Sequence, residues 1–199
     1  MPESEYKTKK DLSVSMVAAN LYSILFAVPA AVVLVVVYLA LWDTGGLFYA
    51  RFLIFKNFYL VLIILIMGVL LHELLHGLTW MWLGKKSPDS IHYGMNLKAL
   101  SPYAHCREPL NIRAYRWGAA MPGLILGILP ALLGILIGNG LIMLFGLLFT
   151  VAAGGDALVL WTLRKENSLE WVLDHPFRAG CIVIESSDLQ TRFSYKEEP

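Results

Sequence analysis

The sequence predicts an all-α polytopic membrane protein with four transmembrane helices, together with a segment between the second and third helices that suits a small β-hairpin. Of the 199 residues, 57% are hydrophobic and only 16% are charged, whereas soluble domains carry about 25% charged residues. No charged residue occurs between Leu12 and Trp42, and none occurs between Trp117 and Gly155. A helix that spans a bilayer needs about 20 apolar residues, and uncharged runs of this length are typical of such helices.

The N-terminal part of the chain predicts a polar tail, 1–13, and a first transmembrane helix, 14–42, with a kink at Pro29. The apolar run continues far beyond the roughly 7–15 apolar residues of a signal peptide, so we expect this span to be retained. The next segment, 47–55, is aromatic and apolar, and we expect it to lie at the membrane interface.

The second predicted span, 57–83, ends where Gly84 precedes two lysines, which is a common signal for the end of a helix. Beyond it, residues 91–97 alternate loosely between apolar and polar side chains, as a strand does. Residues 100–106 are placed to pair with them, so we expect a hairpin here.

The second half of the chain predicts two further spans, 112–137 and 141–163, joined by a tight turn rich in glycine. The first of these contains two prolines, and the second ends at a pair of basic residues. The remaining segment, 166–199, is polar enough for a soluble tail, within which 180–185 suits a strand. We therefore expect two tails around one membrane domain, 14–165.

The distribution of lysine and arginine predicts a multi-pass protein of the cell membrane with both termini in the cytoplasm. Basic residues gather in the N-terminal tail, in the connection after the second span and at the start of the C-terminal tail. The turn between the third and fourth spans has none, and the connection between the first and second spans has only Arg51 and Lys56. Cytoplasmic loops carry the excess of positive charge in membrane proteins.

Net charge and cysteine spacing exclude two other classes of function. The formal net charge is +1, which gives no basis for nucleic-acid binding. Cys106 and Cys181 lie far apart without a CxxC spacing, so we expect two free cytosolic thiols and no disulfide.

His72, Glu73 and His76 form an HExxH pattern inside the second predicted span. On a helix this spacing puts both imidazoles on one face, where they can share a zinc ion, while Glu73 is placed to act as general base on water. Such groups are expensive inside a bilayer, roughly 2.5–3.5 kcal/mol for a central charge, and a bound metal would offset that cost. A polar cluster between helices and a proton relay are the alternatives.

Asp156 is the candidate third ligand, because a catalytic zinc takes three protein ligands and keeps one position open. It is the isolated charge of the fourth predicted span. His76 lies eight residues before Gly84, and Asp156 likewise lies eight residues before Arg164. Both are therefore about 12 Å from the cytoplasmic ends of their helices, at 1.5 Å per residue, and are expected to meet. Helix packing is the alternative role of Asp156.

Several other residues have more than one open interpretation. His105, which Cys106 follows in the chain, suits a second metal contact, a substrate contact or a loop histidine bonded to the backbone. Residues 174–176 have the composition of a turn. Pro122 either lines the site or only kinks the third helix.

The metal-site residues resemble the three-helix core of the site-2 proteases, in which an HExxH helix supplies two zinc ligands and the third core helix supplies an aspartate. More widely, most of residues 60–185 resembles a bacterial family described as putative zincin peptidases. The segments that carry this second resemblance are 101–109, 121–123, 152–156 and 174–176. The segment Gly-Gly-Asp-Ala at Asp156 departs from the Asp-Gly motif that is usual in site-2 proteases.

These observations predict an intramembrane zinc metalloprotease that hydrolyses peptide bonds of a membrane protein or membrane-associated peptide. The resemblance implies His72, His76 and Asp156 as zinc ligands, with Glu73 as general base. The alternative is a catalytically inactive membrane protein that binds zinc or serves in assembly. A proton-coupled carrier fits less well, since carriers usually contain inverted repeats and no repeat is visible here. The sequence does not define the oligomeric state.

Overall fold

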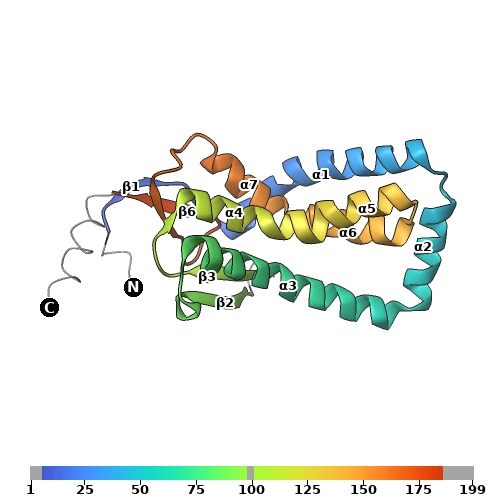
Figure 1. The fold of residues 1–199 in the computed structure, drawn as a ribbon, viewed down its shortest axis with the longest axis horizontal. Helices are drawn as coiled ribbons and strands as arrows, with labels where there is room; N and C mark the ends of the chain where they lie inside the picture. Colours follow the sequence, from blue (N-terminus) through green and yellow to red (C-terminus); the bar gives the residue numbers. More distant parts are fainter. Residues whose placement is uncertain (1–5, 98–100, 186–199) are drawn as a thin grey trace.

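The structure is a computed structural model that describes residues 6–97 and 101–185. Long helices run side by side, and two small antiparallel sheets gather at one end of them (Figure 1). Three helices are long and apolar enough to cross a membrane, and a fourth span is added if a bent helix pair is one span. The described chain is thus mostly helical and consistent with a multi-pass membrane protein, and its small sheets make it not all-α.

Helix α1, Met16–Leu41, is the first candidate span. It starts at Ser15, whose side chain accepts a hydrogen bond from the amide of Ala18 at 3.2 Å and so caps the helix. Pro29 lies within the helix. Most of its large apolar side chains are exposed, as expected for a helix that faces lipid.

Helix α2, Gly45–Lys56, crosses the end of the bundle that lies opposite the sheets (Figure 1). It contains the segment 47–55 that the sequence placed at the membrane interface. A Cβ atom on Gly140 would lie 2.4 Å from the carbonyl oxygen of Gly46, so this end of the molecule closes by backbone contact. The Tyr38 hydroxyl donates to the Gly138 carbonyl at 3.1 Å. This bond holds α1 to the turn at 138–140.

Helix α3, Phe58–Gly84, is the second candidate span. The third is continuous from Ile112 to Ile137 and consists of α4, a π-helical segment and α5. Their bounds are Ile112–Pro122, Gly123–Ile128 and Leu129–Ile137. Prolines occur at both ends of the π-helical segment; because proline has no N–H and its ring crowds the preceding turn, a regular α-helix is disfavoured there.

The fourth predicted span is not one straight helix, and the prediction is wrong on this point. Helix α6, Gly140–Ala152, and helix α7, Gly154–Leu163, meet at an angle of 46°. Two adjacent glycines at the break weaken the helix. Gly154 also lets α1 come close, since a Cβ atom there would lie 2.9 Å from the carbonyl oxygen of Ser23.

The predicted hairpin after the second span is confirmed. Strand β2, Ile91–Asn96, pairs antiparallel with β3, Ser101–Cys106, from Ile91 opposite Cys106 to Asn96 opposite Ser101. A short helical turn, Pro88–Ser90, leads into the hairpin.

A second sheet joins the two ends of the described chain. Its order is β1-β6-β5-β4, which brings the strand before α1 next to the last strand. The bounds are Thr8–Asp11 for β1, Leu110–Asn111 for β4, Trp171–Asp174 for β5 and Cys181–Ile184 for β6. The strand predicted at 180–185 is confirmed as β6, whereas β1, β4 and β5 were not expected. Parts of both predicted tails, 1–5 and 186–199, lie outside the described residues.

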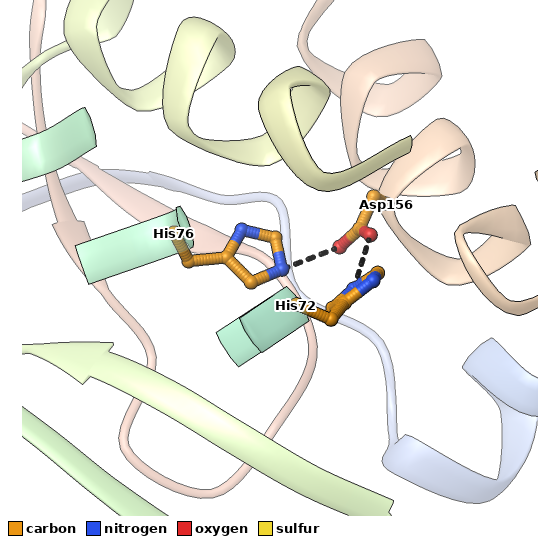
Figure 2. A group of neighbouring side chains, drawn as sticks. All are labelled: His72, His76 and Asp156. Atoms are coloured by element: carbon orange, nitrogen blue, oxygen red, sulfur yellow. Dashed lines mark ion pairs between the residues drawn. The ribbon is translucent and has the colours of Figure 1, made fainter. Parts of the chain in front are cut away.

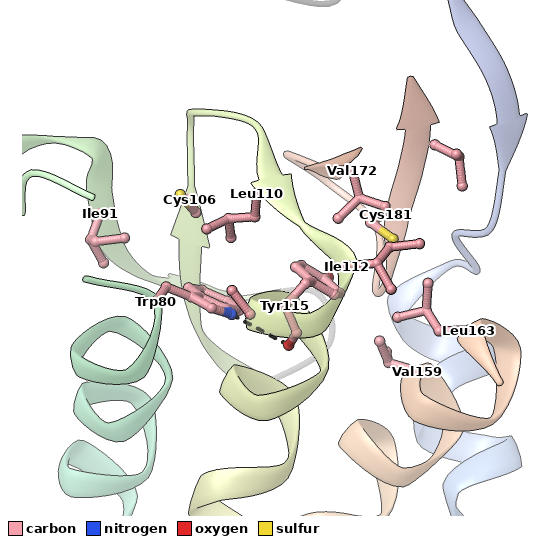
Figure 3. Close-up of a cluster of buried hydrophobic side chains, with 12 residues drawn as sticks. Trp80, Ile91, Cys106, Leu110, Ile112, Tyr115, Val159, Leu163, Val172 and Cys181 are labelled. Carbon is pink, nitrogen blue, oxygen red and sulfur yellow. Dashed lines mark hydrogen bonds between the residues drawn. The ribbon is translucent and has the colours of Figure 1, made fainter. Parts of the chain in front are cut away.

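A buried cluster fills the space where the sheets meet the helices (Figure 3). Trp80 of α3 and Tyr115 of α4 stack at its centre, with ring centroids 5.6 Å apart and an interplanar angle of 10°. Trp80 lies against Gly118, where a Cβ atom would come within 1.9 Å of its indole nitrogen. This packing fixes α3 against α4 one helical turn beyond His76, whose ring also stacks on Trp80.

The closest helix packing generates a first prediction. A Cβ atom on Gly146 of α6 would lie 2.1 Å from the backbone nitrogen of Ala131 in α5, and the backbone cannot move aside as a side chain can. Gly146→Ala should therefore lower the free energy of unfolding by at least the roughly 1–3 kcal/mol that is typical of overpacking. Thermal unfolding of the detergent-solubilised protein measures the loss.

Leu148→Ala on the same helix is the matched control. Leu148 is 46% exposed, so its truncation should change the free energy of unfolding by no more than about 0.5 kcal/mol. Equal unfolding temperatures for Gly146→Ala and the unmodified protein would contradict the close approach of α5 and α6.

Candidate metal centre

The structure brings together the three residues that the sequence predicted as metal ligands (Figure 2). His72 and His76 project from one face of α3, and Asp156 reaches them from α7. The Nε2 atom of His72 lies 3.2 Å from Oδ2 of Asp156, and Nε2 of His76 lies 3.4 Å from Oδ1. Each imidazole therefore faces its own oxygen of one carboxylate.

The donor atoms of this group fit a zinc ion in number, kind and spacing. One ligand atom from each of the three residues lies within 4.8 Å of the others, and no other such group occurs among residues 6–97 and 101–185. Tetrahedral ligand atoms at about 2.0–2.1 Å from zinc are about 3.3 Å apart, close to the two contacts observed. Two imidazoles and one carboxylate also leave a fourth position open, as catalytic zinc requires.

The orientation of His76 is fixed by its surroundings. Its Nδ1 atom lies 2.9 Å from the carbonyl oxygen of Gly118 in α4. Because a carbonyl oxygen only accepts, Nδ1 carries the proton, and the lone pair of Nε2 points to the centre of the group. The ring also stacks on Trp80, with centroids 5.7 Å apart. The buried core thus holds this imidazole in the form that binds metal.

Asp156 owes its position to the bend between α6 and α7. It lies in the first turn of α7, where the helix dipole favours a negative charge. The other end of α7 is held by Arg116 of α4, whose guanidinium donates to the carbonyl oxygens of Leu163 and Glu166. A Cβ atom on the preceding Gly155 would meet nothing within 4 Å, so the space at that position is open.

The group lies in a cavity of about 730 Å³ that also contains Glu73. The cavity is bounded by α1, α3, the hairpin, α7 and the loop between β5 and β6. Glu73 follows His72 on α3, and its carboxyl group faces the backbone amide of Ala104 in β3. The predicted general base therefore lies beside the candidate ligands without belonging to their group.

His105 does not belong to the group formed by His72, His76 and Asp156, which we call the metal group. Its Nδ1 atom lies 2.9 Å from Oδ2 of Asp174, which is buried at the end of β5. The structure thus identifies Asp174 as the partner of His105, a role that the sequence left open. Asp174 was expected only in a turn, and a separation of 69 positions along the chain carries no spacing signal that could have paired it with His105. The turn itself is present, since His175 accepts hydrogen bonds from the amides of Phe177 and Arg178.

Cys106 is a buried thiol, and so is Cys181. Burial raises the pKa of the Cys106 thiol to about 11. Burial raises the pKa of Cys181 as well. Among the described residues, neither cysteine belongs to a group of potential metal ligands. Both cysteines are free thiols, as the sequence predicted.

Comparison with known proteins gives one match. A family model described as "Putative zincin peptidase" matches residues 64–169, which is just over half of the chain. The matched segment contains His72, Glu73, His76 and Asp156. No curated protein and no solved structure matches the chain at a significant level. The family description implies zinc, and the role of the three residues as its ligands stays a prediction.

Metal content tests that role, because a histidine–aspartate cluster without metal would make the same contacts. Asp156→Ala should reduce zinc binding by more than the roughly 10–100-fold that loss of an outer-shell partner costs. Elemental analysis of the purified protein, after dialysis against a weak chelator, gives the zinc-to-protein ratio.

Asp89→Ala is the matched control, since Asp89 is an exposed aspartate outside the cavity. It should leave the ratio near one zinc per chain. An unchanged ratio in Asp156→Ala would remove this residue from the ligand set.

Proposed function

This chain belongs to the putative zincin peptidase family, and we propose that it is an intramembrane zinc metalloprotease acting on membrane-associated substrates. The observation that carries the proposal is the meeting of His72, His76 and Asp156 in a cavity that also holds Glu73. The three-ligand arrangement, with two ligands on an HExxH helix and one on a later helix, also supports the likeness to site-2 proteases.

In the proposed mechanism, His72, His76 and Asp156 would hold the metal. When bound, zinc would supply a Lewis acid that lowers the pKa of water toward neutrality. The protein fixes the ligands in advance: the Gly118 carbonyl and the Trp80 ring orient His76, and Arg116 anchors the helix of Asp156.

Glu73 is the proposed general base. Glu73 is not one of the candidate metal ligands. It follows His72 in the chain and lines the same cavity as the ligands. Its carboxylate accepts a proton from the attacking water and then delivers this proton to the leaving amine. Ala104 of the hairpin lines the same cavity as this carboxyl group.

The hairpin supports an extended substrate. A peptide bond in a helix has its carbonyl engaged, so cleavage needs an unwound segment. Cys106 uses its amide to bind Asp174 at 3.2 Å, on the edge of β3 that faces away from β2. Strand geometry puts Ala104 on the same edge, toward the cavity. We propose that substrate adds as a further strand along the part of this edge that precedes Cys106, whose own amide is taken by Asp174.

The membrane position follows from the helices. His76 lies eight residues before the end of α3, so the site would lie about 12 Å inside the span at 1.5 Å per residue. The pairing of β1 with β6 brings the described ends of the chain to one side. With the distribution of basic residues, this supports a cell-membrane protein with both termini in the cytoplasm.

A membrane protein that binds zinc without catalysis is the second candidate. Such a protein needs His72, His76 and Asp156 for structure but has no need for a carboxyl group at position 73. The role of Glu73 therefore separates the two functions.

Glu73→Gln should abolish proteolysis while the metal content is kept. Removing a general base typically lowers the rate by about 10²–10⁴. Cleavage of unfolded casein by the purified protein in detergent measures activity, and elemental analysis measures zinc. Glu108→Gln, at a half-exposed glutamate that pairs with Lys86, is the control and should cleave at the unmodified rate.

The same variant serves as a trap for natural substrates, because it binds them without cutting. Proteins that co-purify with Glu73→Gln and are shortened in cells with the unmodified protein are the expected substrates. Cleavage by Glu73→Gln at the unmodified rate would show that the proteolytic function is wrong.

A further inference from the structure

Asp174 connects three elements next to the metal group. It is only 7% exposed and accepts three hydrogen bonds, one from each of three donors. The Tyr115 hydroxyl in α4 donates at 2.7 Å, the Cys106 amide in β3 at 3.2 Å, and His105 Nδ1 at 2.9 Å. A carboxylate only accepts, so Nδ1 of His105 must carry a proton, and the ring is held with Nε2 on its far side.

His105 lines the cavity that contains the metal group. Its chain neighbour Ala104 presents its amide to Glu73, and consecutive Cα atoms are about 3.8 Å apart, so β3 brings His105 next to the HExxH helix. Within the part of the chain that the structure describes, Nε2 of His105 has no protein hydrogen-bond partner, and it is absent from the buried unpaired atoms. This nitrogen is therefore available to a molecule in the cavity.

We propose that Nε2 of His105 and the metal group together form one oxyanion-binding site, in which Asp174 is the positioning residue. The inference rests on the proposed function and deepens it. When water adds to the substrate carbonyl, the carbonyl oxygen gains negative charge, and a donor fixed in advance stabilises that charge. With Nδ1 bonded to Asp174, Nε2 carries a proton only when the ring is an imidazolium. In that form His105 is the catalytic residue that donates to this oxygen, and no covalent bond to the protein forms or breaks.

The charges around His105 suit this role. Asp174 from β5 stands behind Nδ1 and pairs with the positive charge of the ring when both nitrogens carry protons. Tyr115 from α4 binds the other oxygen of the same carboxylate. His92 lies opposite in β2, and Glu73 from α3 lines the same cavity. An anion that approaches Nε2 thus meets the imidazole edge, with the Asp174 charge already paired.

A structural role for the His105–Asp174 pair, tying the hairpin to β5, is the competing explanation. Replacing His105 by asparagine or by glutamine separates these two roles. His105→Asn keeps a donor near the position of Nδ1, and so the bond to Asp174, but has no counterpart of Nε2. His105→Gln has a donor near the position of Nε2 and loses the bond at Nδ1.

The experiment measures binding of inorganic phosphate, a tetrahedral oxyanion, to the full-length protein substituted with cobalt, from the visible absorption of the metal. His105→Asn should weaken phosphate binding roughly 10- to 100-fold, the range expected for loss of a hydrogen bond to a charged group. His105→Gln should stay within about threefold of the unmodified protein. Acetohydroxamate, which chelates the metal through its own oxygens, should bind all three proteins equally.

Two results would overturn the inference. One is phosphate affinity in His105→Asn that equals the unmodified protein, including the case in which neither binds phosphate. The other is weaker binding in His105→Gln than in His105→Asn, together with a lower unfolding temperature, which would assign the pair to structure. Neither readout needs peptide cleavage. If the protein cleaves no peptide but binds phosphate as described, the proposed function is wrong and the oxyanion-binding site is still supported.

Discussion

The contact of one carboxylate with two imidazoles inside an apolar bundle is the interaction on which the rest of the structure depends. Asp156 faces Nε2 of both His72 and His76, at 3.2 and 3.4 Å. Unpaired polar groups are expensive in a medium without water, so α3 and α7 are favoured together only if these groups meet. The bend before α7 and the Arg116 contacts at its end place the carboxylate where the histidines can reach it.

A chain of aromatic and polar contacts connects the metal group to the sheets. His76 stacks on Trp80, Trp80 stacks on Tyr115, and the Tyr115 hydroxyl binds Asp174 (Figure 3 shows the aromatic pair). Asp174 in turn holds His105 and the backbone of β3. The sheets are therefore part of the site: they fix one wall of the cavity and present a strand edge beside Glu73.

Much of the site could be predicted because polar and charged side chains are energetically unfavourable inside apolar spans. Histidine at positions 72 and 76 and aspartate at position 156 stand out against apolar spans, and helical rise alone put them at equal depth. Asp174 could not be predicted in this way, because an aspartate before a histidine and a proline is ordinary in a turn. His105 likewise had several open roles until the fold brought it to that carboxylate.

The sequence by itself determined the membrane class, the approximate spans, the hairpin and the candidate ligands, because apolar runs, alternation and helical spacing are local properties of the chain. Tertiary structure alone decided the bend between α6 and α7, the pairing of β1 with β6, and the partner of His105. These features depend on contacts between distant segments. A close approach such as that of Gly154 to Ser23 leaves no periodic signal, since a single glycine is compatible with many local conformations.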